Sequence, residues 1–192
     1  IAKPFSKEEL ICRVNNTIEA MENINKIANF VNRDFLTGAY NRRYFYQDIE
    51  EYVQTAEELD EPYAFAMLDI DHFKKINDTY GHDGGDKILK SLAKILTDNT
   101  KGSDVVARFG GEEFCVVLKK IVREEAIKFF VNLRAKVAEN EVVIKDKIVR
   151  VTVSIGISFG KGHCEIDDML EACDSALYVA KENGRNRVEI AL

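Results

Sequence analysis

The chain has 192 residues, of which 46% are hydrophobic and 31% charged, proportions that fit one globular domain with an appendage. It holds no run of about 18 apolar residues and no signal-peptide pattern, so we expect no transmembrane segment. The formal net charge of −6 argues against a general binder of nucleic acid or of anionic membranes.

The four cysteines, Cys12, Cys115, Cys164 and Cys173, lack the spacing of a metal site, and most lie in apolar patterns. We expect them to be small core residues in a reducing cytoplasm. The sequence begins at Ile1 rather than at methionine, so we expect a fragment of a longer protein.

Residues 1–33 are expected to form a separate segment. Their apolar residues alternate spacings of four and three, as in a heptad seam: Leu10, Val14, Thr17, Met21, Ile24, Ala28 and Val31. Asparagine, a poor helix former, is frequent here, so this helix should need a partner. A parallel coiled coil is favoured, and a helix docked on its own domain is the alternative.

The first residues, Lys3-Pro4-Phe5, resemble the end of a bacterial phosphoreceiver domain, where such a turn leads into the last helix. Ser6 is a plausible N-cap for that helix, and Glu9 would complete a capping box. The resemblance implies that the fragment carries the final helix of a receiver, running into a linker.

The stretch from Asp34 to Arg43 reads as a turn followed by a helix, with Asn41 as its cap. The buried stripe of that helix is predicted to be Phe45, Ile49, Tyr52 and Val53. An apolar run of strand length, residues 63–68, then stops abruptly at Asp69-Ile70-Asp71. Carboxylates at the end of a buried strand are usually paired or bound to a cation, so this point favours a functional site.

After His72 to Asp78 comes a loop, Gly81 to Asp86, that opens a helix. The apolar face of this helix is predicted to be Ile88, Leu89, Leu92, Ala93 and Leu96. Asp86 is placed in the first helical turn, where the helix dipole favours a negative charge, so a structural cap is one interpretation of it. His72 and His82 lack zinc spacing and are expected in turns or on the surface.

Gly110-Gly111 separates two apolar runs and predicts a hairpin, because glycine reaches the positive φ angles of a tight turn. Two carboxylates, Glu112 and Glu113, follow. They either face water or form a metal site on a turn without side chains, which a bulky anionic ligand can approach.

The remaining chain predicts two helices and three strands. One helix is marked by Ala126, Phe130, Leu133 and Val137, and the last by Ile166, Met169, Leu170, Cys173 and Leu177, with Lys181 before Gly184. The strands are predicted at Val142 to Ile144, at Ile148 to Ile157 with one buried face, and at Arg185 to Ile190. No internal repeat is present.

Six separated motifs, in order, closely resemble the GGDEF family of bacterial diguanylate cyclases: Asp34–Arg43, Asp69–Lys74, Asn77–Asp86, Arg108–Phe114, Thr152–Gly156 and Ala176–Asn186. The hairpin has Glu where the family name has Asp, which keeps the carboxylate. The resemblance covers residues 34–192 as the second domain. It implies an α+β fold with a mixed, largely antiparallel central sheet and helices on its faces, like nucleotide cyclases and polymerase palms, preceded by a long N-terminal helix.

The reaction implied by the resemblance condenses two GTP into cyclic di-GMP and releases two pyrophosphates. The implied cofactor is Mg²⁺, with Mn²⁺ as the alternative. The family pattern places Asp69, the carbonyl of Ile70 and Glu112 around the metal. Glu112 is also implied as the proton acceptor and Lys74 as the transition-state stabiliser. Glu113 is a weaker candidate, either supporting a metal or holding a neighbouring cation.

The implied substrate site joins triphosphate-binding cations to guanine-binding polar groups. Lys181 and Arg185 are assigned to the triphosphate, Asp86 and Asn77 to guanine, and Phe73, His82, Gly110 and Gly111 to the rest of the pocket. Without the resemblance, Lys74, Lys181 and Arg185 would read as solvated surface charges. Guanine offers two neighbouring N–H donors that one carboxylate can accept, so the chemistry favours GTP over ATP.

One domain holds one GTP, so the resemblance implies a homodimer, through the N-terminal helix and facing catalytic domains. The hypothesis is that receiver phosphorylation drives this dimerisation. Many relatives carry an Arg-x-x-Asp product-inhibition site, where this chain has Lys101 and Asp104. Lysine lacks the planar fork of arginine, which predicts weak feedback inhibition. The alternatives are a catalytically inactive nucleotide-binding module and a cyclase that makes another product from one nucleotide.

Overall fold

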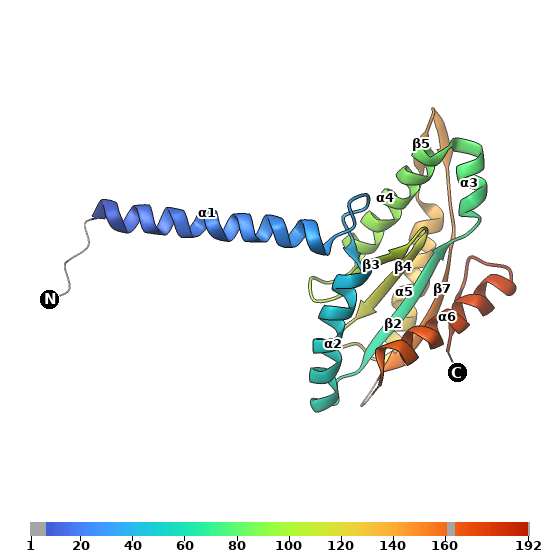
Figure 1. Ribbon diagram of the computed structural model, residues 1–192. Coiled ribbons are helices and arrows are strands. Elements are labelled where there is room, and N and C mark those ends of the chain that lie inside the picture. Colours follow the sequence, from blue (N-terminus) through green and yellow to red (C-terminus); the bar gives the residue numbers. More distant parts are fainter. Residues whose placement is uncertain (1–6, 161–163, 192) are drawn as a thin grey trace.

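The computed structural model describes residues 7–160 and 164–191, and its centre is a mixed six-stranded sheet (Figure 1). The strand order is β1-β3-β4-β2-β7-β8, formed by β1 (Tyr40–Asn41), β2 (Tyr63–Ile70), β3 (Val105–Gly110), β4 (Glu113–Leu118), β7 (Val153–Gly160) and β8 (Val188–Ile190). A separate two-stranded sheet pairs β5 (Val142–Ile144) with β6 (Lys147–Val149). The helices are α1 (Lys7–Asn32), α2 (Arg42–Glu58), α3 (Phe73–Tyr80), α4 (His82–Asn99), α5 (Arg123–Glu139) and α6 (Ile166–Glu182).

Strand β2 lies in the middle of the sheet and pairs antiparallel with both β4 and β7. Only the outer pairs, β1 with β3 and β7 with β8, are parallel. This arrangement confirms the expected mixed, largely antiparallel sheet with helices on its faces. The register sets Asp69 opposite Glu113 on one side and Ser154 on the other.

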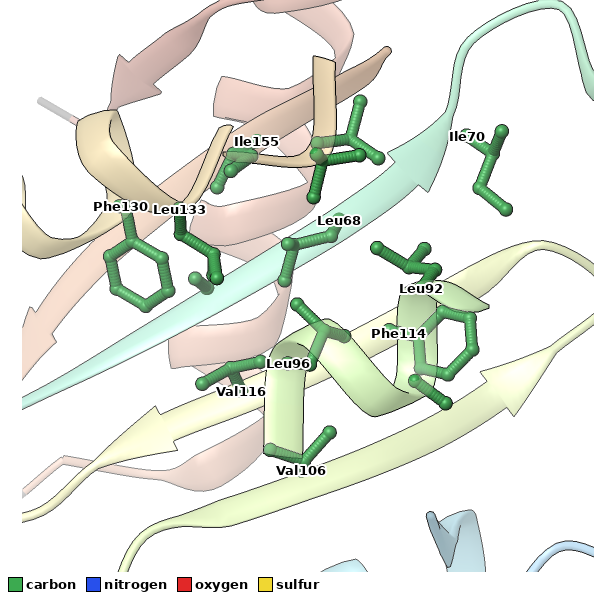
Figure 2. Close-up of a cluster of buried hydrophobic side chains, with 14 of the residues drawn as sticks. Leu68, Ile70, Leu92, Leu96, Val106, Phe114, Val116, Phe130, Leu133 and Ile155 are labelled. Atoms are coloured by element: carbon green, nitrogen blue, oxygen red, sulfur yellow. The ribbon is translucent and has the colours of Figure 1, made fainter. Parts of the chain in front are cut away.

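Both faces of the sheet are covered, which explains why all eight residues of β2 are buried. One core joins β2 and β4 to α3, α4 and α5, with Leu68, Phe114, Leu92, Leu96 and Phe130 among its members (Figure 2). The other core joins the opposite face to α2 and α6. The predicted core positions of α4, α5 and α6 lie in these clusters, as do Phe45, Ile49 and Val53 of α2.

Helix α1 projects away from the sheet (Figure 1). Leu10, Val14 and Met21 of its predicted seam are 56%, 50% and 60% exposed, so at these positions the helix is not docked on its own domain. Coiled-coil pairing and a linker role stay predictions. The receiver-like Lys3-Pro4-Phe5 turn and the proposed cap Ser6 lie outside the described residues. Among the residues that the structure describes, no helix has the length and apolar character of a membrane span.

The junction after α1 is held by Asn41. Its Oδ1 accepts the amide N–H of Tyr44 at 2.9 Å, which confirms it as the cap of α2. Its Nδ2 donates to the carbonyl of Val31 at 2.7 Å, in the last turn of α1. One carboxamide therefore joins the end of α1 to the start of α2.

The prediction of a loop from Gly81 to Asp86 was wrong, because α4 already begins at His82. The first-turn carboxylate is therefore Asp83, and Asp86 lies one turn further along. The sequence also missed the eight-residue helix α3. Helices α3 and α4 pack closely because Gly84 and Gly85 of α4 face α3. A Cβ on Gly84 would lie 2.5 Å from that of Tyr80.

The strand predicted from Ile148 to Ile157 is divided between two sheets. Its first part is β6, and its second part is β7, separated by residues 150–152. The expectation of one buried face was also wrong, since Ser154 and Ser158 are buried with the apolar residues. Helix α6 covers that second face, and a Cβ on Gly156 would lie 2.1 Å from the carbonyl oxygen of Cys173.

Candidate active site

The carboxylate of Asp69 lies at the end of β2 and is only 7% exposed. Lys181, near the C-terminus of α6, places its Nζ 2.9 Å from Asp69 Oδ2. Burial raises the pKa of Asp69, and the hydrogen bond and charge of Lys181 partly offset that effect. The strand end predicted as a site therefore holds a buried carboxylate that is already paired with a cation.

The double-glycine turn lies between β3 and β4, as predicted, with Gly111 at a φ of 38°. Arg108 holds this turn through two hydrogen bonds, from Nε and Nη2 to the carbonyl of Gly111, at 3.1 and 2.7 Å. Its Nη1 donates to Asp34 Oδ1 at 3.0 Å. Burial would raise the pKa of Asp34, but hydrogen bonds from Thr37 and Arg108 outweigh it and lower the pKa. The turn is thus fixed to the residues that follow α1.

Glu112 is partly buried beside this turn. Burial raises its pKa first, and the negative charge of Asp69 raises it further. The two carboxylates assigned to one metal therefore lie within electrostatic range of each other, and Lys181 acts on both. A cation bound to both of these hard oxygen donors would offset the repulsion between their negative charges.

Glu113 is exposed and has different surroundings. The guanidinium of Arg42 lies 5.4 Å from the ring centre of Phe109 and interacts electrostatically with Glu113. Of the two supporting roles predicted for Glu113, holding a neighbouring cation is the one this arrangement favours.

No group of three or more His, Cys, Asp or Glu side chains within residues 7–160 and 164–191 lies close enough together to hold a metal ion. Mg²⁺ binds through one or two carboxylates, waters and substrate phosphates rather than a cage of protein ligands. The donor set of Asp69, Glu112 and the Ile70 carbonyl matches that chemistry.

The assigned cations come from two places. Lys74 is exposed in the first turn of α3, whose N-terminus has no side-chain cap. Lys181 and the exposed Arg185 lie at the end of α6 and just after it, and Arg185 Nη1 donates to the Lys181 carbonyl at 3.3 Å. An uncapped helix N-terminus offers free N–H groups to an anion.

The two residues assigned to guanine meet where α3 and α4 pack together. A Cβ on Gly85 would lie 2.0 Å from Asn77 Oδ1, so the glycine allows Asn77 to lie against the residue preceding Asp86. Both Asn77 and Asp86 are partly exposed, and His82 is exposed at the start of α4. Phe73 differs, because its side chain is buried in the core.

Asp71 has a position that the sequence did not reveal. It is 5% exposed and accepts hydrogen bonds from Thr152 Oγ1, Ser154 Oγ and the amide of Asn186, at 2.6, 2.7 and 3.0 Å. The signal was present in the polar residues Thr152 and Ser154, which alternate with the apolar Val151, Val153 and Ile155.

The residues of the degenerate inhibition site, Lys101 and Asp104, line a surface pocket of about 520 Å³ with several tyrosines. Both carboxylate oxygens of Asp104 accept main-chain N–H groups, from Lys101 at 2.8 Å and from Lys119 at 3.1 Å. Asp104 therefore fixes the loop.

Comparisons with known proteins identify the family of this chain. A family model described as "Diguanylate cyclase, GGDEF domain" matches residues 31–187. The diguanylate cyclase DosC of Escherichia coli K12 is 34% identical over 161 residues, covering 83% of this chain and 35% of DosC. The response regulator PleD of Caulobacter vibrioides is 32% identical over 198 residues, covering 98% of this chain and 44% of PleD.

Among solved structures, the coiled coil and GGDEF domain of DgcB from Caulobacter crescentus, in complex with c-di-GMP, is similar with a TM-score of 0.85. The identity is 27%, and the match covers 96% of this chain and 98% of that one. The chain spans less than half the length of the two curated relatives.

Proposed function

The chain belongs to the GGDEF family of diguanylate cyclases, and from this premise we propose that it condenses two GTP into cyclic di-GMP with release of two pyrophosphates. The observation that carries the proposal is the buried Asp69, paired with Lys181 and in electrostatic range of Glu112 at the double-glycine turn. Two carboxylates and a lysine at one strand end suit the binding of a metal-complexed triphosphate. The complex of DgcB with c-di-GMP supports the identity of the product.

In this proposal the guanine base lies at the junction of α3 and α4. Asp86 accepts the two N–H donors of the base, and Asn77 makes the other polar contact. The partial exposure of both side chains leaves them accessible to a ligand. Adenine lacks that pair of donors, so the site prefers GTP.

The triphosphate lies between the N-terminus of α3 and the end of α6. Lys74, Lys181 and Arg185 neutralise its charge, and the uncapped amides of α3 donate to its oxygens. Lys181 leaves Asp69 for the phosphates when the nucleotide binds. Asp69, Glu112 and the Ile70 carbonyl would hold Mg²⁺, or Mn²⁺, and the bound ion would supply charge neutralisation at the reacting phosphate.

Glu112 accepts the proton of the attacking 3′-hydroxyl, and Lys74 stabilises the charge that develops on the α-phosphate. Gly110 and Gly111 leave the turn without side chains, so that the bulky nucleotide can approach. The reaction closes a ring between two nucleotides, so two domains must face each other. Because the proposed substrate is GTP, a cytoplasmic nucleotide, we also propose a cytoplasmic location for the domain.

We further propose that α1 brings the two domains together and that a receiver domain precedes it. The half-exposed apolar side chains of α1 support the first statement, and the similarity to a response regulator across 98% of the chain supports the second. Phosphorylation of that receiver would then control the distance between the two half-sites.

The test is incubation with GTP and Mg²⁺, followed by chromatography, with wild type beside Glu112→Ala. We expect wild type to form cyclic di-GMP and pyrophosphate, and the variant to be slower by about 100-fold or more. Asp98→Ala, which removes an exposed partner of Lys94 on α4, is the control and should keep full activity. Binding of GTP without turnover by wild type would instead identify an inactive nucleotide-binding module.

A further inference from the structure

The loop of residues 184–186, which we call the cation loop, follows α6 and carries Arg185. Its backbone is unusual, since Arg185 and Asn186 have φ angles of 64° and 45°. Consecutive left-handed residues other than glycine are rare, and they persist only where the surroundings fix them. The contacts that fix this loop therefore decide where its cation lies.

Asp71 provides such contacts from inside the protein. Its Oδ2 accepts the amide N–H of Asn186 at 3.0 Å, and its own N–H donates to the Thr152 carbonyl at 2.9 Å. The hydroxyls of Thr152 and Ser154 donate to Oδ2 and Oδ1, at 2.6 and 2.7 Å. A 5% exposed carboxylate with three donors is rigid, because each contact fixes another part of its geometry.

The outer side of the loop is held by α5. Arg134 Nη1 donates to the carbonyl of Asn186 at 3.2 Å and to its Oδ1 at 2.6 Å. Asn186 is thus clamped between Asp71 and Arg134, and Arg185 immediately precedes the clamp. The amide N–H of Arg185 donates to the carbonyl of Ala180 at 3.0 Å, and Ala180 directly precedes Lys181.

From these contacts we propose that Asp71 is a positioning residue: it aims the cation loop, and with it Arg185, at the triphosphate. The inference rests on the proposed function, because it assigns Arg185 to that ligand. Asp71 does not touch the substrate in this scheme. Its carboxylate, two residues after Asp69 on the same strand end, links the metal-binding strand to the phosphate-binding loop.

The test is equilibrium binding of 3′-deoxy-GTP with Mg²⁺ to the full chain, because this analogue lacks the attacking hydroxyl. Asp71→Asn keeps the side-chain shape but loses one acceptor oxygen, and Thr152→Val keeps the shape but loses the hydroxyl donor. Each should weaken binding of the analogue by about tenfold. Thr152→Ser restores the hydroxyl and should bind like wild type.

Ser158→Ala is the matched control. Ser158 is buried on β7, the strand that Thr152 directly precedes, but its hydroxyl donates to the Met169 carbonyl at 2.9 Å, away from the cation loop. We expect Ser158→Ala to lose about as much thermal stability as Thr152→Val and to bind 3′-deoxy-GTP like wild type. In the free protein, hydrogen exchange at the Asn186 amide should accelerate in Asp71→Asn and not in Ser158→Ala.

The double variant Asp71→Asn/Arg185→Ala separates positioning from general damage. If Asp71 acts through Arg185, the double variant should bind no more weakly than Arg185→Ala alone. The inference would be overturned if the losses of binding affinity in the double variant were additive. It would also be overturned if Thr152→Val and Ser158→Ala weakened binding equally. Failure of wild type to bind the analogue would reject the proposed function itself, whereas normal binding by Asp71→Asn would reject only the role of Asp71.

Discussion

Asp69 and Glu112 lie in surroundings that favour their neutral forms. Burial raises the pKa of both, and for Glu112 the charge of Asp69 adds to the effect. A carboxyl group with a raised pKa in the folded state binds its proton more tightly there than in the unfolded chain. Its contribution to stability is complete below the unfolded pKa and is lost as pH rises through the folded pKa.

The first prediction at this scale concerns Glu112→Gln in metal-free buffer. At pH 7 the variant should unfold at a higher temperature than wild type, because it removes a charge that is disfavoured in the fold. The difference should shrink as pH falls through the pKa of Glu112, since wild type then becomes neutral there. Thermal unfolding between pH 4 and pH 8 (about the range in which carboxylates titrate) measures it, with the exposed Glu51→Gln as control. A lower unfolding temperature at pH 7 would contradict the argument.

Lys101 gives the second residue-scale prediction. A lysine cannot grip a phosphate or a guanine edge in two places, and Asp104 is occupied by main-chain amides. We expect weak or absent inhibition by cyclic di-GMP, and Lys101→Arg should increase product binding at this pocket. Calorimetric titration with the product measures this change. Tight product binding by wild type that vanishes in Lys101→Ala would refute it.

At the scale of elements, Arg108 ties the β3–β4 turn to Asp34. The side chains of Arg108 and Asp34 are only 14% and 16% exposed, so Arg108→Ala should lower the free energy of unfolding by about 1–3 kcal/mol. A double-mutant cycle with Asp34→Asn, measured by urea unfolding, should give a coupling of at least about 0.5 kcal/mol. We also expect lower activity, because the Gly111 carbonyl loses its two donors. Additivity of the two single variants would show that the pair does not act together.

Helix α6 approaches β7 at Gly156, which leads to another prediction. Gly156→Ala should destabilise the fold by about 1–3 kcal/mol, because the added methyl group would meet the main chain at Cys173 and Leu177. Chemical denaturation measures the loss. Gly102→Ala is the control, since its added Cβ would meet no atom within 4 Å. Equal stability of the two variants would mean that α6 can move away freely.

Much of this element structure could be predicted from local patterns. The helices α5 and α6 follow from apolar spacing, and the turn at Gly110-Gly111 from the glycine pair between two apolar runs. The failures have tertiary causes. Helix α3 has only eight residues and two buried positions, Phe73 and Ile76, too few to establish a helical period from the sequence. The division of β6 from β7 depends on which sheet each part joins. Small residues on β7 look like a solvent face until α6 is known to cover them.

For the candidate site, the sequence indicated Asp69 and the glutamates of the turn, because a carboxylate at the end of an apolar run has few structural uses. It could not show that Lys181, more than a hundred positions later, pairs with Asp69, since that contact depends on the packing of α6. Asp71 was missed for the same reason: two of its three donors come from β7 and its flank, and the third from residue 186.

On the scale of the whole molecule, α1 presents apolar side chains without covering them. Leu10, Val14, Ile18 and Met21 are each about half exposed or more. Val14→Asp should leave the fold intact and raise the protein concentration needed for half-maximal activity by about tenfold, because each buried apolar side chain contributes about 1.5–3 kcal/mol. Specific activity over a dilution series measures this shift.

Glu19→Gln, on the opposite side of α1 from the seam, is the control and should behave like wild type. Activity per chain that does not change with dilution in wild type would contradict a requirement for two copies.

The double use of the Asn41 carboxamide has a mechanical consequence. Its hydrogen bonds join the last turn of α1 to the first turn of α2. A rotation of α1 about its own axis is therefore transmitted to the catalytic domain. Each residue added to a helix turns whatever lies upstream by about 100°. The angular phase of α1, as much as its length, therefore sets which way an upstream module drives the domain.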